Sequence, residues 1–222
     1  MQKHFETELE NLKINITKMA SIVEEMVENS FTALVNSDLE LCQKIKARDR
    51  EIDAYDNLIK TQCENILALF QPMAIDLRFI LTALMINNQL ERCGDIAVNI
   101  TQRVKPLIDY KSLVDESKIL EMGSVAKSMF KDAIDSFINR DANLAEQIGN
   151  KDNIVDDYNK NIFRFLIEKM KNQPELIEPA AHLMILSRHI ERLADHSTNI
   201  AEDVIFMVNA EIVSHKHKLG LK

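Results

Sequence analysis

The sequence predicts an all-α protein made of two tandem antiparallel three-helix bundles that are related by an internal repeat. Its composition favours long helices with few tight turns, because the 222 residues include only 4 glycines, 4 prolines and no tryptophan. The motif E-R-x-x-D-x-x-x-N-I, preceded by an apolar residue, occurs at residues 90–100 and again 100 positions later at 190–200. This spacing divides the chain into a first bundle at 1–108 and a second at 109–222.

Three helices are expected in the first half of the chain. A heptad repeat of apolar residues predicts a first helix that ends near Asn36, and Ser37, followed three residues later by Glu40, matches a capping box for the next helix. Isoleucines seven residues apart characterise the second helix. Pro72 ends it, because proline cannot continue the hydrogen-bond ladder. The third helix begins after this break and is limited by Pro106.

The second half repeats this organisation. Residues 106–116 connect the two bundles, and a fourth helix with its own apolar stripe follows. A fifth helix is expected over about 141–171, and a sixth begins after Pro174 and holds the second copy of the motif. The polar tail at 214–222 is interpreted as a frayed, solvated terminus.

Charge, hydropathy and cysteine content argue against several classes of protein. A formal net charge of −8 is unlike that of nucleic-acid-binding proteins, which normally have an excess of Lys and Arg. The sequence shows no signal peptide and no apolar run of about 18 residues, so direct membrane insertion is not expected. Cys42, Cys63 and Cys93 are far apart and form no C-x-x-C pair. They are interpreted as buried free thiols of a protein in a reducing cytoplasm.

Each copy of the motif places a Glu, an Asp and an Asn four residues apart, so that their side chains form a ladder along one side of a helix. In the first copy these residues are Glu91, Asp95 and Asn99. Two carboxylates at this spacing repel each other by about 0.2–0.5 kcal/mol. An arrangement of this kind that occurs twice suggests that a cation binds to it.

The positions of the acids relative to the hairpin turn predict which of them meet. Asp53 lies 19 residues before Pro72 and Glu91 lies 19 residues after it, while Asp49 and Asp95 are each 23 residues away. In an antiparallel hairpin, equal distance from the turn means equal height along the bundle. We therefore expect the D-x-x-x-D of the second helix to face the E-x-x-x-D of the third, in a carboxylate patch partly walled by a neighbouring helix.

The second hairpin shows the same symmetry around its turn at 173–174. Asp156 matches Glu191 in height, and Asp152 matches Asp195. Carboxylate and amide oxygens are hard ligands that suit Mg²⁺, Mn²⁺, Ca²⁺ or iron better than copper. The sequence therefore predicts one metal patch in each bundle, and four carboxylates can hold more than one ion.

A solvated acidic face with ion pairs along each helix is the competing interpretation. Arg92 with Asp95, and Arg188 with Glu191, have the i,i+3 spacing of such pairs. Glu91 has no basic residue at the i±3 or i±4 positions, so pairing along its own helix is not expected there.

Other functional signatures are missing from the sequence. It contains no Glu-x-x-His, which argues against a ferritin-like di-iron oxidase. It contains no G-x-x-x-x-G-K-[ST] and no G-x-G-x-x-G, so nucleotide binding is unsupported. It also lacks H-E-x-x-H and G-x-S-x-G, so hydrolase chemistry has no signature, and the chain is not expected to be an enzyme.

The paired motifs make the chain resemble the PhoU family, the phosphate-transport accessory and regulatory proteins of bacteria. Residues 71–78, 90–100 and 190–204 carry the resemblance, which covers essentially the whole chain. It implies a cytoplasmic negative regulator of phosphate uptake and of the phosphate-starvation response. The implied partners are the ATPase of the phosphate-specific ABC transporter and the sensor histidine kinase of the phosphate regulon. Exposed heptad edges are compatible with a homodimer.

The resemblance also implies multinuclear metal clusters on the bundle surfaces. The divalent or trivalent ion would be iron, zinc, magnesium or manganese, and its identity stays open. By motif position, the candidate ligands are Asp49, Asp53, Glu91, Asp95 and Asn99 in the first bundle, and Asp152, Asp156, Glu191, Asp195, Asn199 and Asp203 in the second. Ile96 stands where family members often have a histidine, whereas His196 occupies that position in the second bundle, so the two sites are expected to differ.

Three functions are compatible with these observations. The leading hypothesis is a non-enzymatic signalling adaptor with one metal patch in each bundle. The alternative is a metal-independent interaction module that docks basic partners through its acidic faces. The third is a metal-dependent enzyme acting on phosphate esters, for which the sequence offers no general base apart from the ligands.

Overall fold

The structure of the chain, a computed structural model, describes residues 2–212 and consists of helices and connections within that range. The short elements are η1 (Ile108–Tyr110) and α4 (Lys111–Glu116), which lie between the two halves, and η2 (Pro174–Leu176), which precedes the last helix. The six long helices are α1 (Gln2–Asn36), α2 (Leu39–Phe70), α3 (Ala74–Leu107), α5 (Ile119–Asn139), α6 (Ala142–Asn172) and α7 (Ile177–Asn209). The predicted all-α fold with two three-helix repeats is confirmed.

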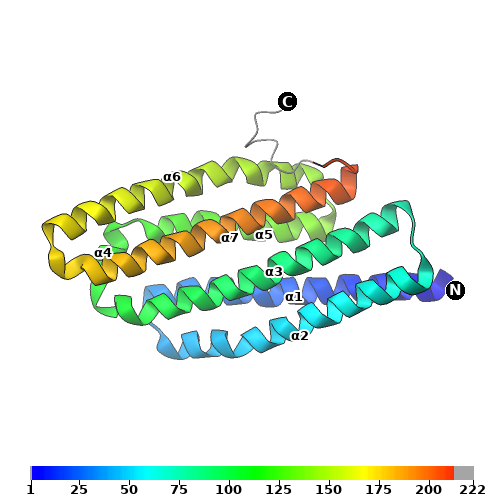
Figure 1. Cartoon of the computed structure of the whole chain (residues 1–222), viewed down its shortest axis with the longest axis horizontal. Helices are drawn as coiled ribbons and strands as arrows, with labels where there is room; N and C mark the ends of the chain where they lie inside the picture. The colour runs from blue at the N-terminus through cyan, green and yellow to red at the C-terminus, as the bar shows by residue number, and fades with distance from the viewer. Residues whose placement is uncertain (1, 213–222) are drawn as a thin grey trace.

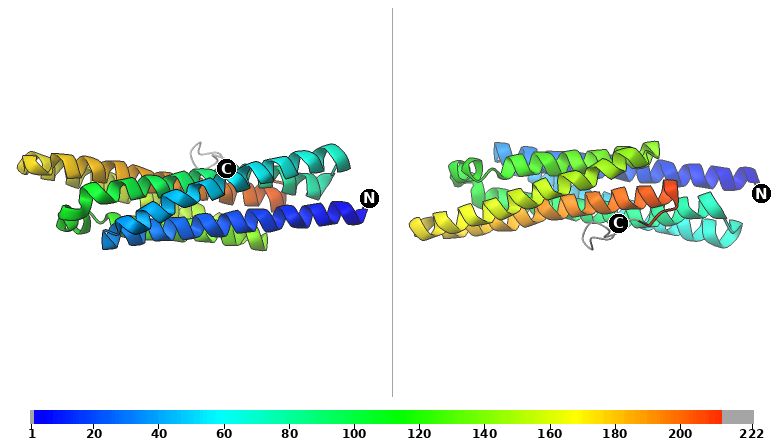
Figure 2. Two further views of the ribbon diagram at one scale, coloured as in Figure 1. Left: turned by 90° about the horizontal axis from the view of Figure 1, so that it is seen from below. Right: turned by 90° about the horizontal axis from the view of Figure 1, so that it is seen from above.

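The two bundles lie side by side and share one core. Figure 1 shows α1, α2 and α3 in one half and α5, α6 and α7 in the other, with α3 and α7 adjacent at the centre. Viewed from the sides in Figure 2, all six long helices run along one elongated axis. Helix α3 packs along α7 as well as against α1 and α2, and buried residues of both bundles form a single hydrophobic cluster. Because α3 has neighbours on several sides, it is apolar around much of its circumference.

The contact between α3 and α7 also includes polar pairs. Gln89 Oε1 lies 2.7 Å from His196 Nδ1, and Arg103 donates from Nη1 to His182 Nδ1 at 3.1 Å. As the residue number rises along α3 it falls along α7 by the same amount, so the two helices are antiparallel. The pairs tie the central helices together in a single register.

The helix ends agree with the predicted boundaries, with two corrections. Helix α2 is capped by Asp38 rather than Ser37, because the Asp38 carboxylate accepts a hydrogen bond from the backbone N–H of Leu41 at 2.9 Å. Ser37 instead has a φ of 56°, which turns the chain between the helices. Pro106 lies inside α3, one residue before its end, rather than beyond it. The predicted frayed tail at 214–222 lies outside the described residues.

Helix hydropathy and the burial of the three cysteines can be compared with the sequence-based expectations. No helix within the described range is long and apolar enough to cross a bilayer. The three cysteines are free thiols, of which Cys63 and Cys93 are buried, whereas Cys42 is only half-buried. Burial raises the pKa of the Cys63 thiol to about 12, so it stays protonated and unreactive.

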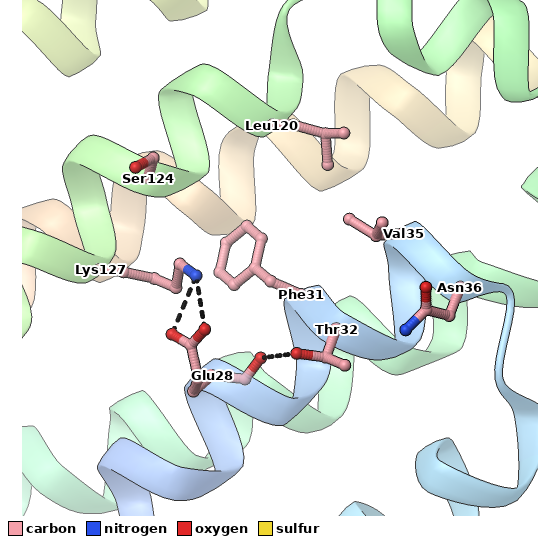
Figure 3. Close-up of a pocket in the computed structure, with 8 residues that line it drawn as sticks. All are labelled: Glu28, Phe31, Thr32, Val35, Asn36, Leu120, Ser124 and Lys127. Atoms are coloured by element: carbon pink, nitrogen blue, oxygen red, sulfur yellow. Dashed lines mark hydrogen bonds and ion pairs between the residues drawn. The ribbon is translucent and has the colours of Figure 1, made fainter.

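Helices α1 and α5 approach each other closely beside Gly123. Figure 3 shows Phe31 of α1 projecting toward α5 in a pocket whose wall includes the ion pair between Lys127 Nζ and Glu28 Oε2, at 2.9 Å. A Cβ atom at Gly123 would lie 2.2 Å from Cε1 of Phe31, a separation that real structures do not tolerate. The absence of a side chain at Gly123 therefore allows Phe31 to pack.

We predict that Gly123→Ala destabilises the protein by about 1–3 kcal/mol, because the added methyl group overlaps the Phe31 ring. The matched control is Gly149→Ala in α6, where a new Cβ meets no atom within 4 Å. That substitution is expected to stabilise by about 0.5–1 kcal/mol, since alanine is the better helix former. Urea unfolding of both variants measures the free energies, and a stabilising Gly123→Ala would contradict the packing described here.

Candidate functional site

The first acidic patch lies where α2 and α3 run side by side. Asp49 on α2 is half-buried, and this burial raises its pKa; the charges of Asp95 and Asp53 raise it further. The charge of Asp95 on α3 therefore acts on Asp49 across the helix pair, and Asp53 adds to the same negative region from its exposed position on α2. Asn99, one turn beyond Asp95 on the ladder, is half-buried.

The acid of α2 that acts on Glu91 is Asp56, and not Asp53, which was predicted to lie at the same height along the bundle. Burial is the main cause that raises the pKa of Glu91; among charges on α2, Asp56 raises it further and Lys60 opposes the rise. Asp53 is not among the charges that act on Glu91. Asp56 lies on the buried side of α2, on which Ile52 and Ile59 also lie, and it faces α3.

Arg92 neutralises part of the ladder on its own helix. Its Nε lies 3.3 Å from Glu91 Oε2, and its Nη1 lies 3.5 Å from Asp95 Oδ2. The expectation that Glu91 does not pair along its own helix is therefore wrong, because the long Arg92 side chain reaches the residue directly before it. With 55% of the Arg92 side chain exposed, each contact contributes about 0–1 kcal/mol.

A buried polar cluster next to this patch was missed by the sequence reasoning. Asp56 Oδ1 accepts a hydrogen bond from Asn87 Nδ2 at 2.7 Å, and Asp56 Oδ2 accepts one from Lys60 Nζ, also at 2.7 Å. Asn87 is fully buried. Two acceptor atoms of the cluster region, Asn87 Oδ1 and Glu91 Oε2, are buried without a hydrogen-bond partner. The sequence signal that could have revealed this cluster was a polar residue at a core-facing position of each helix, Asp56 on α2 and Asn87 on α3.

The second patch is organised around α6 and α7. Glu191 is ion-paired with Arg188, as the i,i+3 spacing predicts, and its side chain is only 15% exposed. Asp152 Oδ1 accepts a hydrogen bond from Thr198 Oγ1 at 3.5 Å, which joins the two helices. The remaining predicted ligands that are half-buried here are Asp156, Asp195 and Asn199.

His196 and Asp203 have surroundings unlike the rest of the second patch. Burial lowers the pKa of His196, although the neighbouring charge of Asp195 raises it. Asp203 is 8% exposed, and its Oδ2 is buried without a hydrogen-bond partner. Burial, followed by the charge of Glu202, raises the pKa of Asp203 to about 7.

The donor chemistry of the first patch suits a hard cation. Burial and then the charge of Asp95 raise the pKa of both Asp49 and Glu91, and Glu91 Oε2 is a buried acceptor without a hydrogen-bond donor. Within residues 2–212, however, no group of three or more His, Cys, Asp or Glu side chains is already arranged to hold a metal ion. An ion would therefore have to draw these side chains together.

The fold and the duplicated ladder define a helical repeat protein built from two copies of one three-helix unit. A family model described as the PhoU domain matches the chain twice, at residues 16–104 and 119–204, once in each bundle. The chain therefore belongs to the PhoU family, which confirms the resemblance carried by the motifs.

Curated relatives match the chain over nearly its full length. The phosphate-specific transport system accessory protein PhoU homolog of Caulobacter vibrioides is 34% identical over 221 residues, which covers 99% of this chain and 96% of that protein. The homolog of Aquifex aeolicus, with the same description, is 37% identical over 210 residues and is covered to 95%, as is this chain.

Solved structures of the family share the fold. The crystal structure of PhoU from Pseudomonas aeruginosa matches with a TM-score of 0.87 and 32% identity, covering 93% of this chain and 100% of that chain. The phosphate transport system regulatory protein PhoU from Streptococcus pneumoniae matches with a TM-score of 0.86 and 30% identity, covering 95% and 99% of the two chains. The names of these relatives describe accessory and regulatory proteins of phosphate transport.

We predict that Asp203→Asn stabilises the protein at pH 8 but not at pH 4. The folded-state pKa of about 7 exceeds the ordinary value of 3.8, so the folded protein binds the extra proton between these values. Stability is then fully present below about pH 4 and falls as the pH rises through 7. Asparagine imitates the protonated acid, so the variant is expected to gain on the order of 1–3 kcal/mol at pH 8.

Chemical unfolding at both pH values measures this difference. Asp157→Asn serves as the control, because the Asp157 side chain on α6 is 75% exposed. An equal effect of Asp203→Asn at pH 4 and pH 8 would show that Asp203 does not carry the proton in the folded state.

Proposed function

We propose that the chain is a negative regulator of phosphate uptake and of the phosphate-starvation response, and that it acts as a metal-binding adaptor in the cytoplasm. The observation that carries this proposal is the duplicated acidic ladder, in which the charge of Asp95 on α3 acts on Asp49 on α2, in a chain of the PhoU family. The names of the relatives support the link to phosphate transport. The family resemblance supplies the partners: the ATPase of the phosphate ABC transporter and the sensor histidine kinase of the phosphate regulon.

The acidic patches are the part of the molecule suited to bind the ions. In the first bundle the ion would be held by Asp49, Asp53, Glu91, Asp95 and Asn99, and in the second by the corresponding residues of α6 and α7. A bound cation neutralises carboxylates that otherwise repel one another, and it offers open positions to water or phosphate. We expect this to change how the acidic faces meet a partner surface, without a catalytic step by the protein, which acts as a homodimer.

We predict that protein purified without chelator contains metal and that a variant with four neutralised ladder acids does not. The variant is Glu91→Gln, Asp95→Asn, Glu191→Gln and Asp195→Asn. The matched control neutralises four exposed acids elsewhere, Glu10→Gln, Glu40→Gln, Glu121→Gln and Glu146→Gln. Elemental analysis by mass spectrometry should find metal in the wild type and the control only. Equal metal in all three proteins would rule out the proposed patches.

A metal-independent docking module is the second candidate. It is favoured by the ion pairs that already neutralise ladder acids, Arg92 with Asp95 and Arg188 with Glu191. Capture of the purified transporter ATPase distinguishes the two functions. Capture that survives EDTA but weakens with salt supports the module, whereas capture that is lost with EDTA and restored by metal supports the metal-dependent adaptor.

A further inference from the structure

The buried polar cluster of Asp56, Lys60, Asn87 and Glu91, here called the inner corner, differs from the acidic patch in position and composition. Asn87 lies one helical turn before Glu91 on α3, and Asp95 lies one turn after it. The inner corner is thus on the side of Glu91 nearer the hairpin turn, while Asp49 and Asp95 lie on the other side.

Two oxygen atoms of the inner corner lack a donor. The Asn87 amide is oriented by Asp56, which accepts its Nδ2–H, so Asn87 Oδ1 must be the free acceptor. Glu91 Oε2 is the second acceptor; its Arg92 contact at 3.3 Å does not satisfy it as a hydrogen bond. Leaving a buried acceptor unsatisfied costs about 1–3 kcal/mol. Asn87 and Glu91 are four residues apart and lie on the same face of α3, so one bound group can reach both acceptors.

The described part of the second bundle has no unpaired buried acceptors at the position equivalent to the inner corner. Residues of α6 follow those of α2 at an offset of 103, so Asn159 replaces Asp56 and Phe163 replaces Lys60. On α7, at an offset of 100, Ser187 replaces Asn87. Ser187 donates its hydroxyl to Asn159 Oδ1, which makes a neutral pair between the helices. Only the first bundle therefore combines a buried carboxylate with free acceptors at this position.

We propose that the inner corner is a separate cation site, present in the first bundle alone, for a hard divalent ion such as Mn²⁺ or Mg²⁺. Its donors are Asp56 Oδ2, Asn87 Oδ1 and Glu91 Oε2. Three oxygen donors and no sulfur select hard ions. The proposal rests on the proposed function only in that Glu91 also belongs to the acidic patch.

Lys60 acts as a tethered cation that occupies the site when no ion is bound. The Asp56 side chain is only 12% exposed, so its charge requires a counter-charge at all times. Lys60 supplies that charge, and because its own side chain is 50% exposed it can return to water at little cost. A divalent ion would displace Lys60 from Asp56 Oδ2 and would also satisfy the two acceptors that lysine leaves unpaired.

The test is Mn²⁺ binding to the full chain, measured by electron paramagnetic resonance and calorimetry. Asp56→Asn, which installs the residue that the second bundle has, should remove one Mn²⁺ per chain or weaken it at least tenfold. Lys60→Gln should strengthen the same ion about tenfold, because the competing charge is gone. The matched controls are Asp157→Asn and Lys160→Gln, which disrupt an exposed pair on α6 and should leave Mn²⁺ binding unchanged.

Opposite effects of the two variants show that a cation binds at or beside the inner corner, whereas a purely structural ion pair does not predict them. Unchanged binding in Asp56→Asn, or weaker binding in Lys60→Gln, would overturn the inner corner, since an ion pair that merely supports the fold predicts loss in both. Circular dichroism verifies folding, and if Asp56→Asn does not fold, Lys60→Gln alone decides. Asp49→Asn with Asp95→Asn separates the proposals: loss of Mn²⁺ there but not in Asp56→Asn supports the acidic patch alone, and the reverse supports the inner corner alone.

Discussion

The antiparallel contact between α3 and α7 constrains the rest of the structure. These central helices join two bundles into one hydrophobic core, so each has to be apolar toward its own bundle and toward the other. The polar pairs at this contact, Gln89 with His196 and Arg103 with His182, set its register. With these sides occupied, each ladder of acids is confined to the remaining side, where α2 runs along α3 and α6 along α7.

Much of the fold could be predicted from heptads and breaks, because a three-helix bundle leaves a regular apolar stripe on each helix. The contact between bundles could not, since a stripe does not identify its partner. Gln89 and His196 look like surface residues until the two helices are placed together. The Ser37 cap was predicted from the motif alone, whereas Asp38 is the residue whose carboxylate reaches the free backbone N–H.

The sequence predicted how far along the bundle the acids of the candidate site lie, but not the direction in which each side chain points around its helix. Counting from the turn places Asp49 level with Asp95, and the charge of Asp95 acts on Asp49. The same count places Asp53 level with Glu91, but residues three apart differ in direction by about 60° on a helix. That rotation is enough for the buried Asp56, rather than the exposed Asp53, to act on Glu91. Burial of one acid in an apolar seam depends on the packing of both helices, which a residue count does not contain.

The internal repeat allows the two halves of one molecule to serve as comparisons for each other. The central contact has Arg103 bonded to His182 in one half, whereas the position equivalent to Arg103 holds Asp203, which is buried with an unpartnered oxygen. Between α2 and α3 of the first bundle, the charged Asp56 accepts a hydrogen bond from Asn87. Between α6 and α7 of the second bundle, the equivalent pair consists of the neutral Asn159 and Ser187. Equivalent positions of the two halves thus differ in charge.

In the first bundle, side-chain cations neutralise part of the acidic charge. Arg92 and Lys60 are each about half exposed, so either cation can exchange its contact with an acid for hydration when another cation takes its place. The exposed contact of Arg92 with Asp95 contributes about 0–1 kcal/mol. Asp56 and Glu91, whose side chains are 12% and 25% exposed, are more buried than these cations and cannot return to water in the same way. A divalent ion would therefore compete against weakly held side-chain charges, and the folded backbone would not have to change for the exchange to take place.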